Sequence, residues 1–211
     1  MNATLPVEIT NEISLDPQKA RQFGEQLAAT YCSADPYPHI VIDDFLPSVL
    51  ADLILENFPI APLDGDIHFK GGVFEHNKRQ ILPYKCNEIV KSIFLFFNSA
   101  PFLEFIEGVT AIEGLIPDPY FHGAGFHEIS KGGKIGIHAD YRIQAQLHVN
   151  RRVNIVIYLN RNWNKAYGGE LELWDRAMTK KFRSVEHLMN LPAASCGVSQ
   201  NIASKTSRKQ S

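Results

Sequence analysis

The sequence predicts an α+β fold in which N-terminal helices pack on a β-sandwich or jelly roll. Apolar residues recur at helical spacing in the first half of the 211-residue chain. From Tyr120 onward they alternate with polar residues, as in half-buried strands. The composition, 45% hydrophobic and 21% charged, is ordinary for a globular protein. Helices followed by strands, in a chain of one-domain length, favour a helical layer on a sheet.

The first helix is expected to begin after Ser14-Leu15-Asp16, a segment that supplies a capping side chain. Pro17 suits the first helical turn because the missing N–H has no intrahelical partner there. The apolar residues that follow at helical spacing are Ala20, Phe23, Leu27 and Tyr31. Residues 1–35 are therefore predicted to form an N-terminal helical segment.

The next predicted elements belong to a domain expected to span residues 36–190. A strand is expected over residues 38–45 and a helix over Ser48–Phe58. Glycines and aspartates between residues 63 and 72 indicate a loop and a hairpin.

Two further helices are expected at Asn87–Asn98 and Ser99–Glu107, the second ended by Gly108. Their phenylalanine-rich faces are interpreted as core rather than as a cofactor site. These faces carry Phe94, Phe97, Phe102 and Phe105.

The second half of the domain is expected to consist of short strands. Apolar residues occupy alternate positions from Ile143 to Val149 and again from Val153 to Leu159. Gly168 and Gly169 favour a tight entry into a further strand rather than a chemical role.

Charge and cysteine content narrow the function classes. The formal net charge of −2 gives no indication of a nucleic-acid or membrane partner. The three widely spaced cysteines, Cys32, Cys86 and Cys196, form no disulfide framework or metal motif. The N-terminus lacks the basic and apolar regions of a signal peptide. A cytoplasmic location is therefore expected.

His138 and Asp140 are the candidate metal ligands. On a strand, residues two apart point to the same face, so this imidazole and carboxylate would project together. A 2-His-1-carboxylate triad of this kind leaves open positions on Fe(II). His-x-Asp alone is a weak signal, since a strand histidine and a turn-forming aspartate give the same pattern.

The surrounding sequence strengthens the metal interpretation. Phe126-His-Glu-Ile129, His138-Ala-Asp140, Arg152-Val-Asn-Ile-Val-Ile-Tyr-Leu-Asn160 and Gly168-Gly-Glu-Leu-Glu-Leu-Trp174 follow one another in this order. Together with Trp163, they closely resemble the 2-oxoglutarate/Fe(II)-dependent dioxygenases, with the prolyl-4-hydroxylase-like group as the nearest branch. The resemblance is strong over about residues 100–190, and residues 36–46 are similar to the entry strand of that group.

The resemblance implies a double-stranded β-helix, or jelly roll, that holds Fe(II) and the cosubstrate 2-oxoglutarate, with ascorbate as a further possible cofactor. It implies hydroxylation of a C–H bond as 2-oxoglutarate and O2 yield succinate and CO2. His138 and Asp140 match the metal pair, and Tyr158 matches a tyrosine that hydrogen-bonds the 2-oxoglutarate carboxylate. A half-buried tyrosine with a solvated hydroxyl is an equally good interpretation of Tyr158. Relatives hydroxylate prolyl residues in proteins, free amino acids or small metabolites, so neither the substrate nor the oligomeric state is predicted.

The third ligand is the missing part of the pattern. After Asp140 the only histidines are His148 and His187. His148 is too close to the pair, and a surface position at a strand end suits His187 better than metal binding. His122 and His127 precede the pair, and His127 could line the pocket, although core or surface positions suit both better.

The end of the chain departs from the family pattern after about Asn190. All 22 aromatic residues lie at or before Phe182, and the last 20 residues are mostly small or polar. Residues 191–211 are therefore expected to be a disordered tail. In the family, strands here carry the second histidine and a basic residue for 2-oxoglutarate. A truncated or frame-altered C-terminus would explain the change, and the β-helix is expected to be incomplete.

Two functions follow from these observations. The first is a 2-oxoglutarate- and Fe(II)-dependent dioxygenase, with prolyl hydroxylation among its candidate reactions, impaired by loss of the distal histidine and the basic residue. The second is a non-catalytic relic or binding module on the same fold. Oxygen consumption coupled to 2-oxoglutarate distinguishes them.

Overall fold

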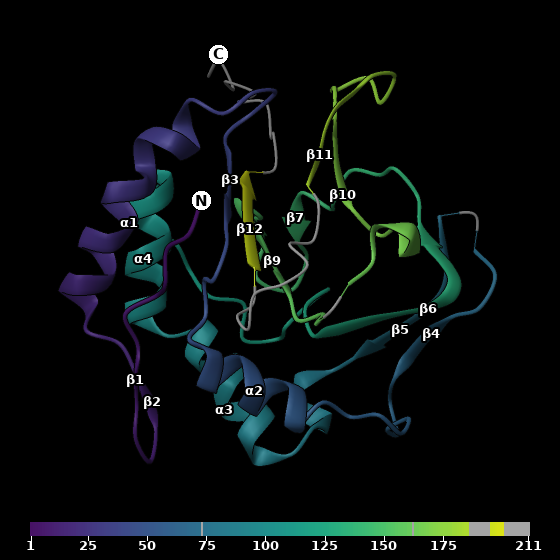
Figure 1. Ribbon diagram of the computed structural model, residues 1–211, viewed down its shortest axis with the longest axis horizontal. Helices are drawn as coiled ribbons and strands as arrows, with labels where there is room; N and C mark the ends of the chain where they lie inside the picture. Colours follow the sequence, from purple (N-terminus) through teal and green to yellow (C-terminus); the bar gives the residue numbers. More distant parts are fainter. Residues whose placement is uncertain (73, 162, 186–194, 201–211) are drawn as a thin grey trace.

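The structure is a computed structural model that describes residues 1–72, 74–161, 163–185 and 195–200 (Figure 1). In this part of the chain, all four α-helices lie within the first 110 residues and most strands follow them. This arrangement agrees with the predicted α+β class.

Helix α1 (Pro17–Cys32) begins where the sequence predicts. The Asp16 side chain accepts a hydrogen bond from the Lys19 backbone N–H at 2.8 Å, and Pro17 occupies the first turn. A short hairpin of β1 (Glu8–Ile9) and β2 (Ile13–Ser14) precedes it. The buried side of α1 carries Ala20, Gly24, Leu27 and Tyr31.

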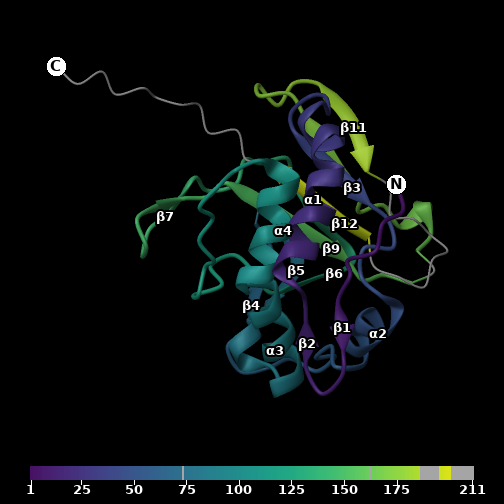
Figure 2. The ribbon, with the colours of Figure 1, turned by 90° about the vertical axis from the view of Figure 1, so that its left-hand side faces the viewer.

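Helix α4 (Ala100–Thr110) packs directly along α1, and Figure 2 shows the two side by side. The prediction that Gly108 ends this helix is wrong, since the helix continues to Thr110 and is capped by Ala111 in the left-handed conformation. A Cβ built at Gly108 would lie 2.5 Å from the Arg21 carbonyl oxygen. Gly108 therefore permits close helix packing rather than helix termination.

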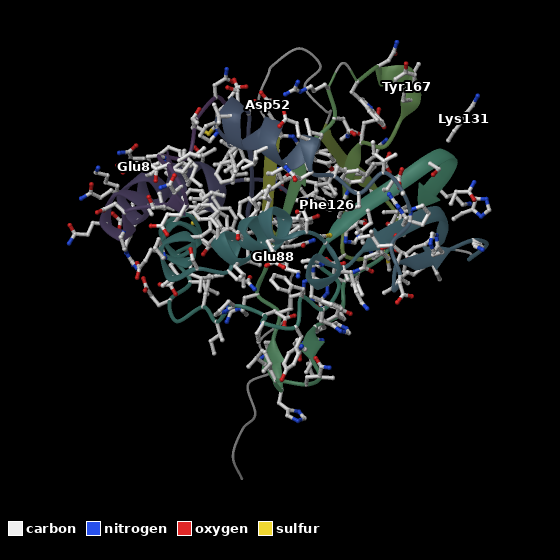
Figure 3. The ribbon with its side chains drawn as sticks, turned by 90° about the horizontal axis from the view of Figure 1, so that it is seen from below. Glu8, Asp52, Glu88, Phe126, Lys131 and Tyr167 are labelled. Atoms are coloured by element: carbon white, nitrogen blue, oxygen red, sulfur yellow. The ribbon has the colours of Figure 1, made fainter. Side chains whose placement is uncertain are left out.

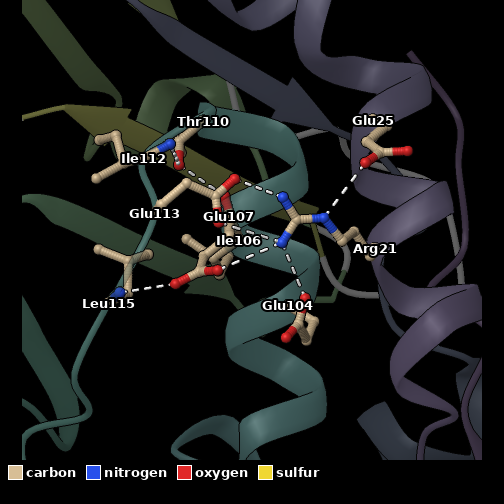
Figure 4. Close-up of polar contacts among 9 residues, drawn as sticks. All are labelled: Arg21, Glu25, Glu104, Ile106, Glu107, Thr110, Ile112, Glu113 and Leu115. Atoms are coloured by element: carbon tan, nitrogen blue, oxygen red, sulfur yellow. Dashed lines mark hydrogen bonds and ion pairs between the residues drawn. The ribbon is translucent and has the colours of Figure 1, made fainter.

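An ion-pair cluster around Arg21 also joins α1 to α4 (Figure 4). The guanidinium contacts four carboxylates and donates to Glu104 at 3.0 Å. Glu107 is buried and also accepts from the Leu115 backbone N–H at 2.7 Å. The four carboxylates belong to Glu25, Glu104, Glu107 and Glu113. Hydrogen bonds to Glu113 and Glu104 raise the pKa of Arg21, and the hydrogen bond from Arg21 lowers the pKa of Glu113.

The core lies between these helices, α2 (Ser48–Glu56), α3 (Glu88–Phe97) and the sheets. The predicted core role of the phenylalanine-rich faces is confirmed, because Phe102 and Phe105 are buried while Phe94 and Phe97 pack against the core. No single described helix is long and apolar enough to cross a membrane. Helices α3 and α4, which meet at a bend of 40°, reach the length and apolar composition of a membrane span only when taken together.

A three-stranded antiparallel sheet has the order β3 (His39–Ile42), β12 (Ser195–Gln200), β9 (Val153–Tyr158). The prediction that the chain is unstructured after about residue 190 is therefore wrong for Ser195–Gln200; the remaining residues of that tail lie outside the described part. Strand β12 hydrogen-bonds to both neighbours, Val198 pairing with Ile40 and with Ile155. Backbone pairing needs no aromatic or alternating side chains, so composition gave no indication of it.

The second sheet leads to the candidate site. Strands β4 (Ile67–Phe69) and β5 (Glu75–Ile81) form the predicted hairpin, and β5 also pairs with β6 (Phe126–Ile135). Figure 3 shows Phe126 in the interior, while Lys131 projects from the far edge of the same strand. The Phe126 ring lies 5.0 Å from that of Phe58 and 5.2 Å from that of Phe94.

The remaining strands form two hairpins. Strand β7 (Ile143–Gln144) pairs with β8 (Val149–Asn150), and β10 (Leu171–Trp174) pairs with β11 (Lys181–Val185). The alternating pattern from Ile143 to Val149 therefore corresponds to two short strands rather than one. A turn interrupts it, because the Gln144 side chain accepts from the Leu147 backbone N–H at 2.8 Å.

All described strands belong to antiparallel sheets of two or three strands. Residues from α1, α4, β3 and β9 share one core, so the helical layer covers the β3–β12–β9 sheet. These small sheets do not confirm a jelly roll, which stays a prediction.

Tyr31 offers a test of this core. It is 1% exposed, and its hydroxyl has no hydrogen-bond partner among the described residues. We expect Tyr31→Phe to raise the free energy of unfolding by about 1 kcal/mol, because it removes a buried unpaired polar group. Urea denaturation at neutral pH measures the change, with the exposed Tyr120→Phe as control.

The same variant has a pH signature. Burial raises the pKa of Tyr31 from 10.0 to about 12. Ionisation of this hydroxyl is harder in the folded than in the unfolded state, so the free energy of unfolding is constant below pH 10 with respect to this group and falls as the pH rises toward 12. Tyr31→Phe should therefore flatten this decline. A loss of stability in the variant at neutral pH would show that the hydroxyl has a partner.

Candidate metal centre

His138 and Asp140 follow strand β6 rather than lying on it, so the prediction that a strand carries them is wrong. The pairing of β5 with β6 ends at Glu75 and Ile135, and one further backbone hydrogen bond joins Gly136 to Phe74. The two side chains nevertheless converge. His138 Nε2 lies 3.5 Å from Asp140 Oδ1.

The imidazole is oriented by its own backbone. His138 Nδ1 lies 2.8 Å from the Gly136 carbonyl oxygen, and because a carbonyl only accepts, Nδ1 carries the proton and donates. In the neutral ring, Nε2 then has a lone pair beside Asp140. Metal-ligating histidines are commonly oriented in this way.

The carboxylate is held on its other side. Asp140 Oδ2 accepts a hydrogen bond from Asn154 Nδ2 at 3.0 Å and lies 3.5 Å from Arg151 Nη2. Oδ1 is the oxygen that faces His138. Sequence reasoning missed Arg151 and Asn154 as partners of Asp140. Alternation along residues 153–159 puts Asn154 on the same face as Tyr158, but it does not specify a contact with Asp140.

These two donors fit an octahedral cation such as Fe(II). Two adjacent ligands about 2.1 Å from such a metal lie about 3 Å apart, close to the observed separation. The His138 side chain is 47% exposed and that of Asp140 is 24% exposed, so the pair is open to a ligand. Imidazole nitrogen with carboxylate oxygen is also a suitable donor set for Fe(II).

A third ligand is not found in the described part of the chain. No group of three or more His, Cys, Asp or Glu side chains there could hold a metal ion. His148 is exposed in the turn of the β7–β8 hairpin, and His187 lies outside the described residues. The described residues therefore supply two of the three protein ligands that a facial triad needs.

Tyr158 ends strand β9, four residues after Asn154. Val153, Ile155 and Ile157 pack against the core, so alternation places Asn154 and Tyr158 on the opposite face. Burial raises the pKa of Tyr158 to about 12. Tyr158 lies about 13 Å further along the strand than Asn154.

The other candidate residues take structural positions. His122 and His127 are exposed, and the His122 carbonyl accepts from the Tyr141 hydroxyl at 2.6 Å. Trp163 Nε1 donates to the Gly168 carbonyl at 3.0 Å. Gly168 and Gly169, with φ of 70° and 83°, shape the entry to β10, and Trp174 at the end of that strand donates to Glu172.

Comparison with known families gives one match. Residues 124–197, about a third of the chain, match the model of the 2OG-Fe(II) oxygenase superfamily. The matched segment contains His138, Asp140, Asn154 and Tyr158, and it extends beyond Asn190, where the resemblance was expected to stop. No curated protein matches the chain. The family match supports the assignment of this segment to the 2OG-Fe(II) oxygenase superfamily.

Proposed function

We propose that this chain is a 2-oxoglutarate- and Fe(II)-dependent dioxygenase domain whose metal site rests on His138 and Asp140. The observation that carries the proposal is the approach of His138 Nε2 to Asp140 Oδ1, with the other atom of each side chain already hydrogen-bonded. Such a pair is oriented before a cation arrives, which lowers the cost of binding it.

The chain's own groups divide the work. His138 and Asp140 would hold the metal, and the Tyr158 hydroxyl would donate to a carboxylate of 2-oxoglutarate. Bound Fe(II), with 2-oxoglutarate and O2, supplies the oxidation of a substrate C–H bond. The substrate we propose is a prolyl residue in a protein, with free amino acids and small metabolites as the other classes.

We further propose that turnover by this chain is weak. Two protein ligands hold a cation but do not fix the three-ligand face that leaves adjacent positions for cosubstrate and O2. The absence of a three-residue ligand group in the described residues equally favours a non-catalytic relic or binding module on the same fold.

Apolar side chains near the pair suggest an unprotected surface. Phe74, Ile135 and Ile137 are 61%, 40% and 40% exposed, and the Phe74 carbonyl accepts from the Gly136 backbone N–H. Exposed apolar clusters of this kind favour association with other molecules. We therefore expect the isolated chain to aggregate readily.

Succinate formation tests the proposed activity. With Fe(II), ascorbate and 2-oxoglutarate, we expect the purified chain to form succinate slowly or not at all. Replacing the residues after Val185 with the matching segment of an active family member should restore turnover, since that segment supplies a histidine and a basic residue.

The control for that experiment is His138→Ala in the restored chain, which should abolish succinate formation. Rapid turnover by the unaltered chain, lost on His138→Ala, would contradict the proposed impairment and would make His187 the next residue to replace. A restored chain that folds but remains inactive would support the binding-module alternative.

A further inference from the structure

We infer that Asn154 and Arg151 are positioning residues that present Asp140 to the metal through one oxygen only. The inference rests on the proposed function, since it concerns the same cation. Three contacts carry it: Asn154 to Asp140, Arg151 to Asn154, and Arg151 to Asp140.

The chemistry of the three groups fixes the orientation of the Asn154 amide. Its Nδ2 faces Asp140 Oδ2 at 3.0 Å, and its Oδ1 faces Arg151 Nη2 at 2.8 Å. A carboxylate only accepts and a guanidinium only donates, so the reversed amide would place two like groups together on both sides. The hydrogen bond from Arg151 polarises the Asn154 amide, which strengthens the hydrogen bond from that amide to Asp140.

Arg151 is itself held in place by the β7–β8 hairpin, which joins the Asp140 segment to β9. Its backbone N–H donates to the Arg142 carbonyl at 2.9 Å, and its guanidinium lies 4.6 Å from the centre of the Tyr141 ring. The Tyr141 hydroxyl donates to the His122 carbonyl. With 19% of its side chain exposed, Arg151 has little freedom to leave Asp140.

This arrangement has a consequence for metal binding. With Oδ2 engaged by Asn154 and Arg151, only Oδ1 is directed toward His138 Nε2. A carboxylate that binds through one oxygen leaves the neighbouring coordination position open, whereas one that binds through both occupies it. Asn154 and Arg151 thus preserve a position that 2-oxoglutarate needs.

Co(II) titration of the full chain tests the inference. Asn154→Ala should weaken Co(II) binding by about tenfold, the lower end for loss of a residue that orients a ligand. Arg151→Gln should act in the same direction. At saturation, both variants should also show a changed visible Co(II) absorption spectrum, because the carboxylate then binds differently.

Matched controls separate positioning from general damage. Asn150→Ala and Arg152→Gln alter exposed residues near the same hairpin and should leave both the affinity and the spectrum at the parent's values. Thermal unfolding without metal should be the same for the parent and Arg151→Gln. If Asn154→Ala unfolds, Arg151→Gln decides the question alone.

Two results would overturn the inference in different ways. If His138→Ala weakens Co(II) binding while Arg151→Gln and any folded Asn154→Ala keep the parent's affinity and spectrum, the positioning role is wrong and the metal pair stands. If His138→Ala binds Co(II) as the parent does, the proposed metal site is wrong and the positioning role falls with it.

Discussion

Gly24→Ala should strongly destabilise the protein, although it adds a single methyl group. A Cβ at Gly24 would lie 2.3 Å from the Phe105 carbonyl oxygen and 2.8 Å from the Val109 backbone nitrogen. Both neighbours are backbone atoms of α4, so they cannot move away without separating the two helices. We expect the free energy of unfolding to fall by about 3 kcal/mol or more, at or above the upper end for an overpacked core.

Gly108→Ala should have a similar effect, since its Cβ would meet the Arg21 carbonyl oxygen. Gly71→Ala is the matched control, because a Cβ there would have no neighbour within 4 Å. Urea denaturation followed by circular dichroism measures all three variants. Parent-like stability of Gly24→Ala would mean that α1 and α4 are further apart than in this structure.

His138→Ala should abolish Fe(II) binding at concentrations that saturate the parent. Among the described residues this pair has no third partner that could keep the ion in place. Asp140→Ala should have the same effect and should also leave Arg151 without its carboxylate. Anaerobic isothermal titration calorimetry measures the binding.

His148→Ala is the control for that titration, because His148 is an exposed histidine of the neighbouring hairpin. It should bind Fe(II) as the parent does. Equal loss of binding in His148→Ala and His138→Ala would assign the ion to the hairpin instead.

The parts of the fold that local chemistry determines could be predicted from the sequence. Asp16 and Pro17 specify the start of α1 through a cap and a fixed φ, and the structure has the helix start there. The alternation from Val153 to Leu159 predicts β9 and its core-facing side. Each of these signals lies within a few residues of the element it specifies.

The parts that depend on distant contacts could not be predicted. Gly108 has the composition of a helix stop, and only the approach of α1 shows that it lies inside α4. Strand β12 forms because its backbone groups pair with those of β3 and β9, and its own composition does not indicate a strand.

The candidate site shows the same division. The His138-x-Asp140 spacing predicted that the two side chains converge, although not that they lie beyond the end of β6. Asn154 and Asp140, which share a hydrogen bond, are fourteen positions apart in the sequence with the β7–β8 hairpin between them, and nothing in the spacing specifies this contact. An alternating pattern predicts the sheet face on which a side chain lies. The residue that it contacts depends on how the hairpin folds back, which the pattern does not specify.

The proposed function depends on His138 and Asp140 binding the metal ion together. Paramagnetic broadening by Mn(II), measured across the backbone amide NMR spectrum of the unaltered chain, tests it most directly. We expect the first amide signals to disappear to be those of residues 136–140 and Asn154, and we expect His138→Ala to prevent this loss. Broadening centred instead on the carboxylates around Arg21, with the signals of residues 136–140 unchanged, would contradict it.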